Sequence, residues 1–152
     1  LSWGDIEWFK QHWGRKIVLK GIQTIEDAKL SVQHGVDAIA LSNHGGRQLD
    51  DAPNPIDLVH PVFNAVGGQV EIFCDGGIRR GSDIVKAIAL GADACMIGRP
   101  FLYGLGAAGE KGVDWVLNFL KDGMHQTMAL LGAKSLTDLN PDLIETRHKV
   151  RA

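Results

Sequence analysis

Short apolar runs alternate along this chain with longer segments whose apolar residues recur every three or four positions. The runs predict four strands, and three of them are apolar on both faces, as parallel strands covered by helices should be. The predicted strands are Ile17–Lys20, Ala38–Ser42, Glu71–Cys74 and Ala94–Ile97. Because a helix-length segment separates each strand from the next, the order of elements predicts βα units and a parallel sheet.

The segments between and around these strands carry helix start and stop signals. Thr24 offers an N-cap hydroxyl three residues before Asp27, and Gly35 follows the last turn of the same helix. Proline at a first helical position and a serine N-cap mark two more starts. The other expected helices are Trp3–Trp13, Pro55–Val66, Asp83–Leu90 with Ser82 as its N-cap, Val113–Leu131 and a short one near Leu136–Asn140.

A four-residue pattern repeats at two helix-to-strand corners. Residues 35–38 and 91–94 both follow the pattern G-x-D-A, and each leads into an apolar strand. A repeated corner suits a (β/α) barrel, whose units must all turn in the same direction.

Composition excludes several classes of protein. The 152 residues carry 18 acidic and 16 basic side chains, a formal charge of −2, so the basic excess expected of a nucleic-acid-binding protein is missing. No apolar run approaches the roughly 18 residues that an integral membrane segment needs. Cys74 and Cys95 lie in apolar runs, as in a reduced cytoplasmic protein, and we expect the cytoplasm or its membrane surface as the location. The first residue is Leu1 rather than Met, which suggests part of a longer protein.

Glycine is unusually frequent, at 19 of 152 residues, and together with charged residues it gathers directly after the strands. Lys20 ends the first predicted strand and Gly21 follows it, whereas N-H-G-G-R-Q (43–48) follows the second, D-G-G-I-R-R (75–80) the third and G-R-P (98–100) the fourth. The opposite corners carry only the G-x-D-A turns. In a barrel the carboxyl ends of the strands hold the active site, so the sequence predicts a polar site at that end.

Two of these loops could bind a phosphate. Gly76, Gly77 and Gly98 can present backbone N–H groups without a Cβ in the way, and Arg79 and Arg99 can add charge-assisted donors. The alternative is that the glycines are ordinary turn residues and the arginines lie on the surface. The second Gly-Arg after the next strand favours the phosphate interpretation.

The loop after the second strand holds candidates for acid–base chemistry. His44 lies between a buried strand and two glycines, and an imidazole suits a general base near neutral pH. Arg47 could hold a substrate carboxylate by two parallel hydrogen bonds. Lys20 either extends from a strand end into solvent or stabilises a developing anion. The two cysteines are too far apart in sequence for a recognisable metal motif, and no P-loop is present, nor a G-x-G-x-x-G directly after a strand.

Three motifs together strongly resemble one family, the FMN-dependent α-hydroxy-acid dehydrogenases and oxidases, which includes glycolate oxidase, L-lactate dehydrogenase and mandelate dehydrogenase. The motifs are S-N-H-G-G-R-Q-L-D at 42–50, D-G-G-I-R-R-G at 75–81 and G-R-P at 98–100. The resemblance extends from Trp3 to about Ile144. It implies the α/β fold of a TIM (β/α)₈ barrel, of which residues 1–152 would form the C-terminal half with strands five to eight.

The resemblance also implies the cofactor, the reaction and the residue roles. FMN would accept two electrons from an L-2-hydroxy acid, lactate-like, to give the 2-keto acid, by a hydride or a carbanion route. Lys20 would lie near flavin N1 and the C2 carbonyl and favour the anionic reduced flavin, and Ser42 would hydrogen-bond the flavin ring edge. His44 would be the base and Arg47 would bind the substrate carboxylate. The ribityl and phosphate groups would contact Asp75, Gly76, Gly77, Arg79, Gly98 and Arg99, although Asp75 could instead orient His44.

Three hypotheses remain open at this point. The first is half of such an enzyme; the second is a non-catalytic half-barrel that binds FMN or phosphate and needs a partner half. The third, a phosphate-binding barrel without flavin, leaves the pairing of His44 with Arg47 unexplained. The expected partners are a small 2-hydroxy acid and either further copies of the chain or the N-terminal half of the barrel, whereas nucleic acid is not expected. Four βα units would leave two sheet edges unpaired.

Overall fold

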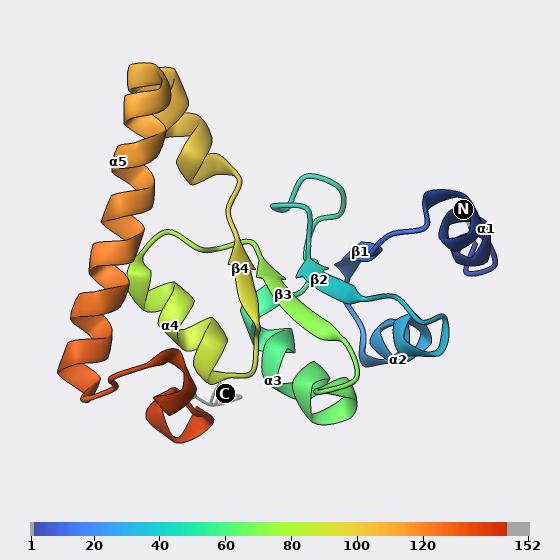
Figure 1. The fold of residues 1–152 in the computed structure, drawn as a ribbon. Coiled ribbons are helices and arrows are strands. Elements are labelled where there is room, and N and C mark those ends of the chain that lie inside the picture. The colour runs from blue at the N-terminus through green and yellow to red at the C-terminus, as the bar shows by residue number, and fades with distance from the viewer. Residues whose placement is uncertain (1, 146–152) are drawn as a thin grey trace.

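Four parallel strands form one sheet in the order in which they occur in the sequence, β1-β2-β3-β4 (Figure 1). The computed structural model describes residues 2–145. The strands are β1 (Val18–Ile22), β2 (Ala38–Ser42), β3 (Glu71–Asp75) and β4 (Ala94–Met96). A helix connects each strand to the next, which confirms the predicted βα organisation and the parallel sheet.

Strand β1 extends further than predicted because of an irregularity at Gly21. Lys20 pairs with Ala40, but Ile22 pairs with Leu41, so the register shifts by one residue between them. Gly21 takes a φ of +99°, which an L side chain rarely adopts, and it absorbs the extra residue as a β-bulge. The predicted end of the strand at Lys20 is therefore wrong by two residues.

The helices largely follow the predicted segments. Thr24 accepts a hydrogen bond from the Asp27 N–H at 3.0 Å, as the N-cap prediction requires. Gly35, at the end of the same helix, has a left-handed φ of +64°. In chain order the helices are α1 (Asp5–Trp13), α2 (Ile25–Gln33), α3 (Pro55–Val66), α4 (Gly81–Ala89) and α5 (Arg99–Leu131), followed by short 3₁₀ turns at Leu136–Asp138 and Pro141–Leu143.

The predicted start of α4 is wrong. The helix begins at Gly81 with Arg80 as its N-cap, rather than at Asp83 after Ser82. The Asp83 carboxylate accepts hydrogen bonds from the N–H groups of Arg79 and Arg80, at 3.0 and 2.9 Å. Because this acid bonds to the amides of the N-cap residue and of the residue before it, the helix starts earlier than the serine suggested.

Helix α5 also begins well before the predicted Val113. Its first arm starts at Arg99 and ends at a break at Ala108 and Gly109, after which a long second arm turns back beside the first (Figure 1). The two arms touch at Gly104 and Gly112, where a Cβ on Gly104 would overlap the Gly112 backbone. The glycine content of the first arm lowers helix propensity, which hid the helix, but it permits this close approach.

The G-x-D-A corners have a structural role at the amino ends of the strands. The Asp37 carboxylate accepts the N–H of Ile17 at 2.8 Å, and the Asp93 carboxylate accepts the N–H of Ile72 at 2.7 Å. Each aspartate therefore ties the start of its own strand to the neighbouring strand. The repeat is therefore explained by these bonds between neighbouring strands, which lie at the end of the sheet opposite the polar site.

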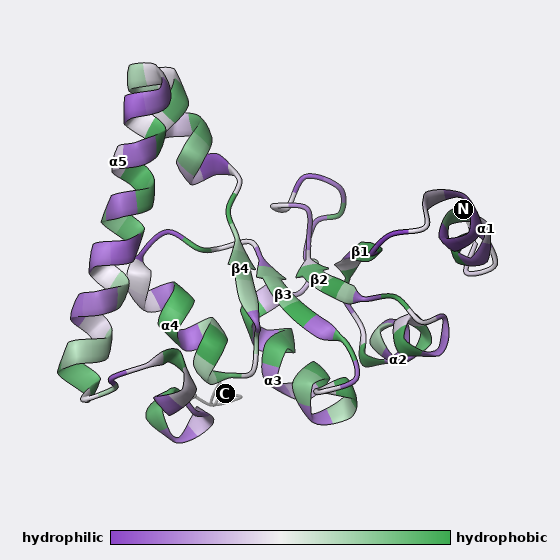
Figure 2. Cartoon of the chain, in the orientation of Figure 1, coloured by the Kyte–Doolittle hydropathy of each residue, from purple (hydrophilic) through white to green (hydrophobic). Residues whose placement is uncertain are grey.

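The core lies between the outer face of the sheet and its helices. Strand side chains there pack against α3, and a second cluster joins α4 to α5. Figure 2 shows β2 and β3 mostly apolar and the loop after β2 mostly polar. Both cysteines are free thiols, and burial raises the pKa of Cys74 to about 11 and that of Cys95 to about 12. Within residues 2–145, no helix is both long and apolar enough to cross a membrane.

Two glycines of the first arm of α5 give a matched test of its packing. Gly104→Ala should lower the free energy of unfolding by about 1–3 kcal/mol, because the new methyl group overlaps the backbone at Gly112. Gly106→Ala should raise it by up to about 1 kcal/mol, since no atom lies within 4 Å of its added Cβ and alanine favours helix. Urea unfolding measures both, and equal effects of the two changes would contradict the two-arm packing.

Candidate functional site

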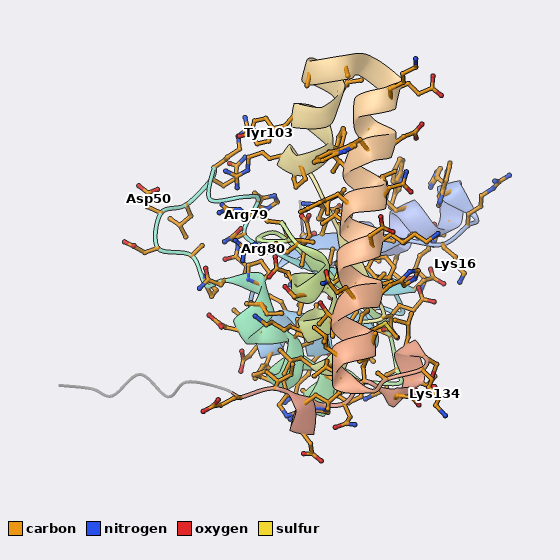
Figure 3. The ribbon with its side chains drawn as sticks, turned by 90° about the vertical axis from the view of Figure 1, so that its left-hand side faces the viewer. Lys16, Asp50, Arg79, Arg80, Tyr103 and Lys134 are labelled. Carbon is orange, nitrogen blue, oxygen red and sulfur yellow. The ribbon has the colours of Figure 1, made fainter. Side chains whose placement is uncertain are left out.

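A cavity of about 770 Å³ lies beyond the carboxyl ends of the four strands. The loops that follow β2, β3 and β4 contribute to its lining and β1 contributes Lys20, in the place where the clustering of polar residues predicted a site. Its volume is in the range of small-molecule and cofactor sites. Figure 3 shows Arg79, Arg80 and Tyr103 on the same side of the molecule as the loop that carries Asp50.

The predicted site residues come together at this cavity with one exception. Ser42 is fully buried at the end of β2 and does not line it. The lining includes all of the others, namely Lys20, His44, Arg47, Asp75, Gly76, Gly77, Arg79, Gly98 and Arg99.

An ion pair across the sheet organises one wall. The Lys20 ammonium lies 2.5 Å from a carboxylate oxygen of Asp75 and donates a hydrogen bond to the Ser42 hydroxyl at 3.1 Å. Ser42 in turn donates to the same carboxylate oxygen at 2.7 Å. The Asp75 side chain is only 16% exposed, so this pairing offsets the cost of taking its charge out of water.

The position of Asp75 bears on the two tasks that the sequence left open for it. Its carboxylate is engaged by Lys20 and Ser42, and among the described residues it makes no hydrogen bond to His44. In this structure the Asp75 carboxylate therefore pairs with Lys20 and Ser42, and not with the His44 imidazole.

A tight turn places His44. Its φ of +55° is left-handed, and its N–H donates to the Ser42 hydroxyl at 3.1 Å. The Asn43 side chain accepts the next amide, that of Gly45, at 3.1 Å. The imidazole lies against the β1 bulge, because a Cβ built on Gly21 would be 2.8 Å from Nε2 of His44. The sequence indicated that Gly21 lies at the strand end, and the structure shows that it also makes room for the histidine.

Cations outnumber the single carboxylate around the cavity. The Arg99 guanidinium donates to the Gly45 carbonyl at 3.1 Å, which joins the His44 turn to the start of α5. Arg47 and Arg79 are exposed, and their side chains have no hydrogen bond within residues 2–145. With Lys20, these groups give the cavity a positive field suited to an anionic ligand.

The backbone at the far wall is open to a ligand. No atom lies within 4 Å of the point where a Cβ would stand on Gly77 or on Gly98. A ligand can therefore approach both peptide units closely, as phosphate binding by backbone amides requires. Within the part of the chain that the structure describes, no group of three or more His, Cys, Asp and Glu side chains could hold a metal ion.

Sequence reasoning missed several lining residues. Tyr103 is 73% exposed and lies one turn after Arg99 on the first arm of α5. Had the helix been traced from Arg99, the spacing of four residues would have placed both on one face. The other missed residues that line the cavity with side chains are Gln48, Ile78, Met96, Ile97, Pro100 and Leu102.

Comparison with known proteins gives one consistent result. The family model for FMN-dependent dehydrogenases matches residues 1–146. The chain is 50% identical over 145 residues to 2-hydroxyacid oxidase 2 of Bos taurus, covering 95% of this chain and 41% of that protein. It is 51% identical over 140 residues to pre-mycofactocin synthase of Mycobacterium tuberculosis (strain ATCC 25618 / H37Rv), covering 92% and 35%. The chain thus spans well under half the length of these relatives.

Solved structures agree on the fold. A soluble mutant of the membrane-associated (S)-mandelate dehydrogenase from Pseudomonas putida matches with a TM-score of 0.92 and 43% identity, over 96% of this chain and 41% of that one. Mandelate oxidase with benzoyl-formic acid matches with a TM-score of 0.88 and 42% identity, over 91% and 42%. The likeness confirms the predicted fold class, a part of a TIM (β/α)₈ barrel.

The contact between the β1 bulge and His44 can be tested with two glycines that share a left-handed φ. Gly21→Ala should shift the NMR signals of the His44 imidazole, because the new methyl group would lie 2.8 Å from Nε2. Gly68→Ala changes a glycine at a φ of +76° with no atom within 4 Å of the added Cβ. It should lower the free energy of unfolding by about 1–2 kcal/mol, because of the left-handed φ, and leave the imidazole signals in place. Unchanged imidazole signals in a folded Gly21→Ala protein would show that the imidazole does not lie against the bulge.

Proposed function

This chain belongs to the FMN-dependent dehydrogenase family, and from that membership we propose that it forms the C-terminal half-barrel of an enzyme that oxidises an L-2-hydroxy acid to a 2-keto acid. One observation carries the proposal. A single cavity brings together an imidazole, a guanidinium group and an ammonium group, those of His44, Arg47 and Lys20. These groups meet the separate needs of proton removal, carboxylate binding and stabilisation of negative charge.

The residues around the cavity fit FMN. The open backbone at Gly77 and Gly98 and the nearby guanidinium groups of Arg79 and Arg99 suit a phosphate dianion. We propose that Gly76 and Asp75 contact the ribityl chain, and that Lys20 and Ser42 lie beside the flavin ring. When bound, FMN supplies a two-electron acceptor that no side chain can replace.

The proposed chemistry needs few groups from this chain. Arg47 binds the substrate carboxylate through paired hydrogen bonds and thereby fixes the orientation of the α-carbon. His44 accepts the proton that the substrate loses, from the hydroxyl in a hydride route or from the α-carbon in a carbanion route. The ammonium of Lys20 stabilises negative charge that develops on its side of the cavity.

The names of similar proteins bear on which 2-hydroxy acid the enzyme prefers. Two relatives have names that refer to 2-hydroxy acids and to mandelate, and a third is a pre-mycofactocin synthase. We propose a small, lactate-like acid, and a panel of L-lactate, glycolate and (S)-mandelate would test this choice directly.

We also propose that a further polypeptide segment completes the barrel. Among the described residues, β1 and β4 each pair on one side only, which leaves two sheet edges with free backbone groups. The complement is either the N-terminal half of the barrel or another copy of the chain.

Adjacent arginines provide a matched test of cofactor binding. Arg79 lines the cavity, whereas Arg80 does not. Arg79→Gln should weaken FMN binding roughly 10- to 100-fold, the loss expected for a charge-assisted contact, and Arg80→Gln should change it less than about twofold. Titration of the chain with FMN, followed by flavin fluorescence, measures both. Equal losses in the two variants would place the phosphate elsewhere.

A second test separates catalysis from mere cofactor binding. In a complete barrel that contains this chain, His44→Gln should slow flavin bleaching by L-lactate at least roughly 100-fold while FMN stays bound. His12→Gln, at an exposed histidine of α1, should leave the rate unchanged. Bound flavin that the acids never bleach, even with His44 present, would instead support a non-catalytic FMN-binding barrel.

A further inference from the structure

Ser42 bonds to three groups around this site, although its own side chain does not line the cavity. Its side chain is fully buried, and its oxygen takes part in three hydrogen bonds to groups on β1, β3 and the loop after β2. A hydroxyl has one hydrogen to donate and two lone pairs to accept with. Asp75 takes the hydrogen, and the Lys20 ammonium and the His44 N–H take the lone pairs, so the capacity of the hydroxyl is filled within the protein.

From this geometry we infer that Ser42 is a positioning residue, which sets the His44 turn and the Lys20–Asp75 ion pair relative to each other. The inference rests on the proposed function only in naming His44 as the base and Lys20 as the stabilising cation. The contacts themselves belong to the chain without any ligand. A direct bond from Ser42 to the flavin would require the hydroxyl to give up one of its three present partners.

The left-handed backbone at His44 explains why an anchor is needed. A φ of +55° is unfavourable for a residue other than glycine, and it persists only where surrounding bonds hold it. The bond from the His44 N–H to the Ser42 oxygen fixes the first peptide of the turn. Because the same oxygen also accepts from the Lys20 ammonium, bonds to one fixed atom set the positions of both the base and the cation.

A strand position makes that atom rigid. Ser42 ends β2, where it pairs in register with Asp75 of β3, and the preceding residues Ile39 to Leu41 are fully buried. The hydroxyl therefore moves with the most buried strand of the sheet, while His44 lies on an exposed loop. We assign to Ser42 the task of holding that loop to the rigid sheet.

Amide hydrogen exchange of the chain, followed by NMR without FMN, tests the inference. Ser42→Ala removes the acceptor and should speed exchange of the His44 amide roughly tenfold and shift the imidazole signals. Ser42→Cys keeps a buried side chain in place but offers a weak acceptor, so it should give a similar increase without opening a cavity. Ser42→Thr retains the hydroxyl and should keep the exchange rate of the His44 amide within about twofold of that in the unaltered protein.

Two controls separate positioning from general loss of stability. Ser31 is the other fully buried serine, and within residues 2–145 its hydroxyl bonds only to the Asp27 carbonyl of its own helix, so Ser31→Ala should leave His44 exchange unchanged. Thr127 has a hydroxyl that donates to the Gly123 carbonyl of its own helix, far from this site in the sequence, and Thr127→Ala should also leave that exchange within about twofold.

Two results would overturn the assignment. One is unchanged His44 exchange in the folded Ser42→Cys protein; the other is faster exchange shared equally by the amides of Ile39 and Leu41. Because FMN is absent from the measurement, failure here leaves the proposed oxidation untouched, and failure of FMN binding leaves this result untouched.

Discussion

A carboxylate at the end of a buried strand must find a partner, and in this protein that partner is Lys20. Asp75 is mostly shielded from water, and an unpaired charge there would be costly. The ammonium of β1 reaches across β2 to the carboxylate of β3, and both groups also bond to the Ser42 hydroxyl. This one pairing fixes the carboxyl ends of three strands and fills one wall of the cavity with a cation.

The other walls depend on backbone that glycine makes possible. The bulge at Gly21 turns the end of β1 and leaves space for the His44 imidazole, and Gly104 allows the two arms of α5 to touch. The first arm carries Arg99, whose guanidinium bonds to the loop of His44. The high glycine content thus serves two purposes, since some glycines open the cavity and others bring its supporting helices into contact.

Local patterns predicted much of this arrangement. The bounds of β2 and α3 follow from a continuous apolar run and from a proline start, and the carboxyl-end loops were placed at one site because parallel strands share their direction. What escaped prediction depends on contacts between distant residues. The bulge at Gly21 is set by pairing with β2, the first arm of α5 by its packing on Gly112, and the neighbours of Asp75 by the register of three strands. Tyr103 was missed for the same reason, because its helix was not recognised.

The most direct test of this account is NMR observation of the Lys20 side chain in the chain itself. Held by Asp75 and Ser42, the Lys20 ammonium should give a resolved ¹⁵Nζ–¹Hζ signal that exchanges slowly with water and disappears in Asp75→Asn. Lys16, an exposed lysine, should give none and serves as the internal reference. A Lys20 signal averaged with those of exposed lysines in the unaltered protein would contradict the claim that this ion pair organises the site.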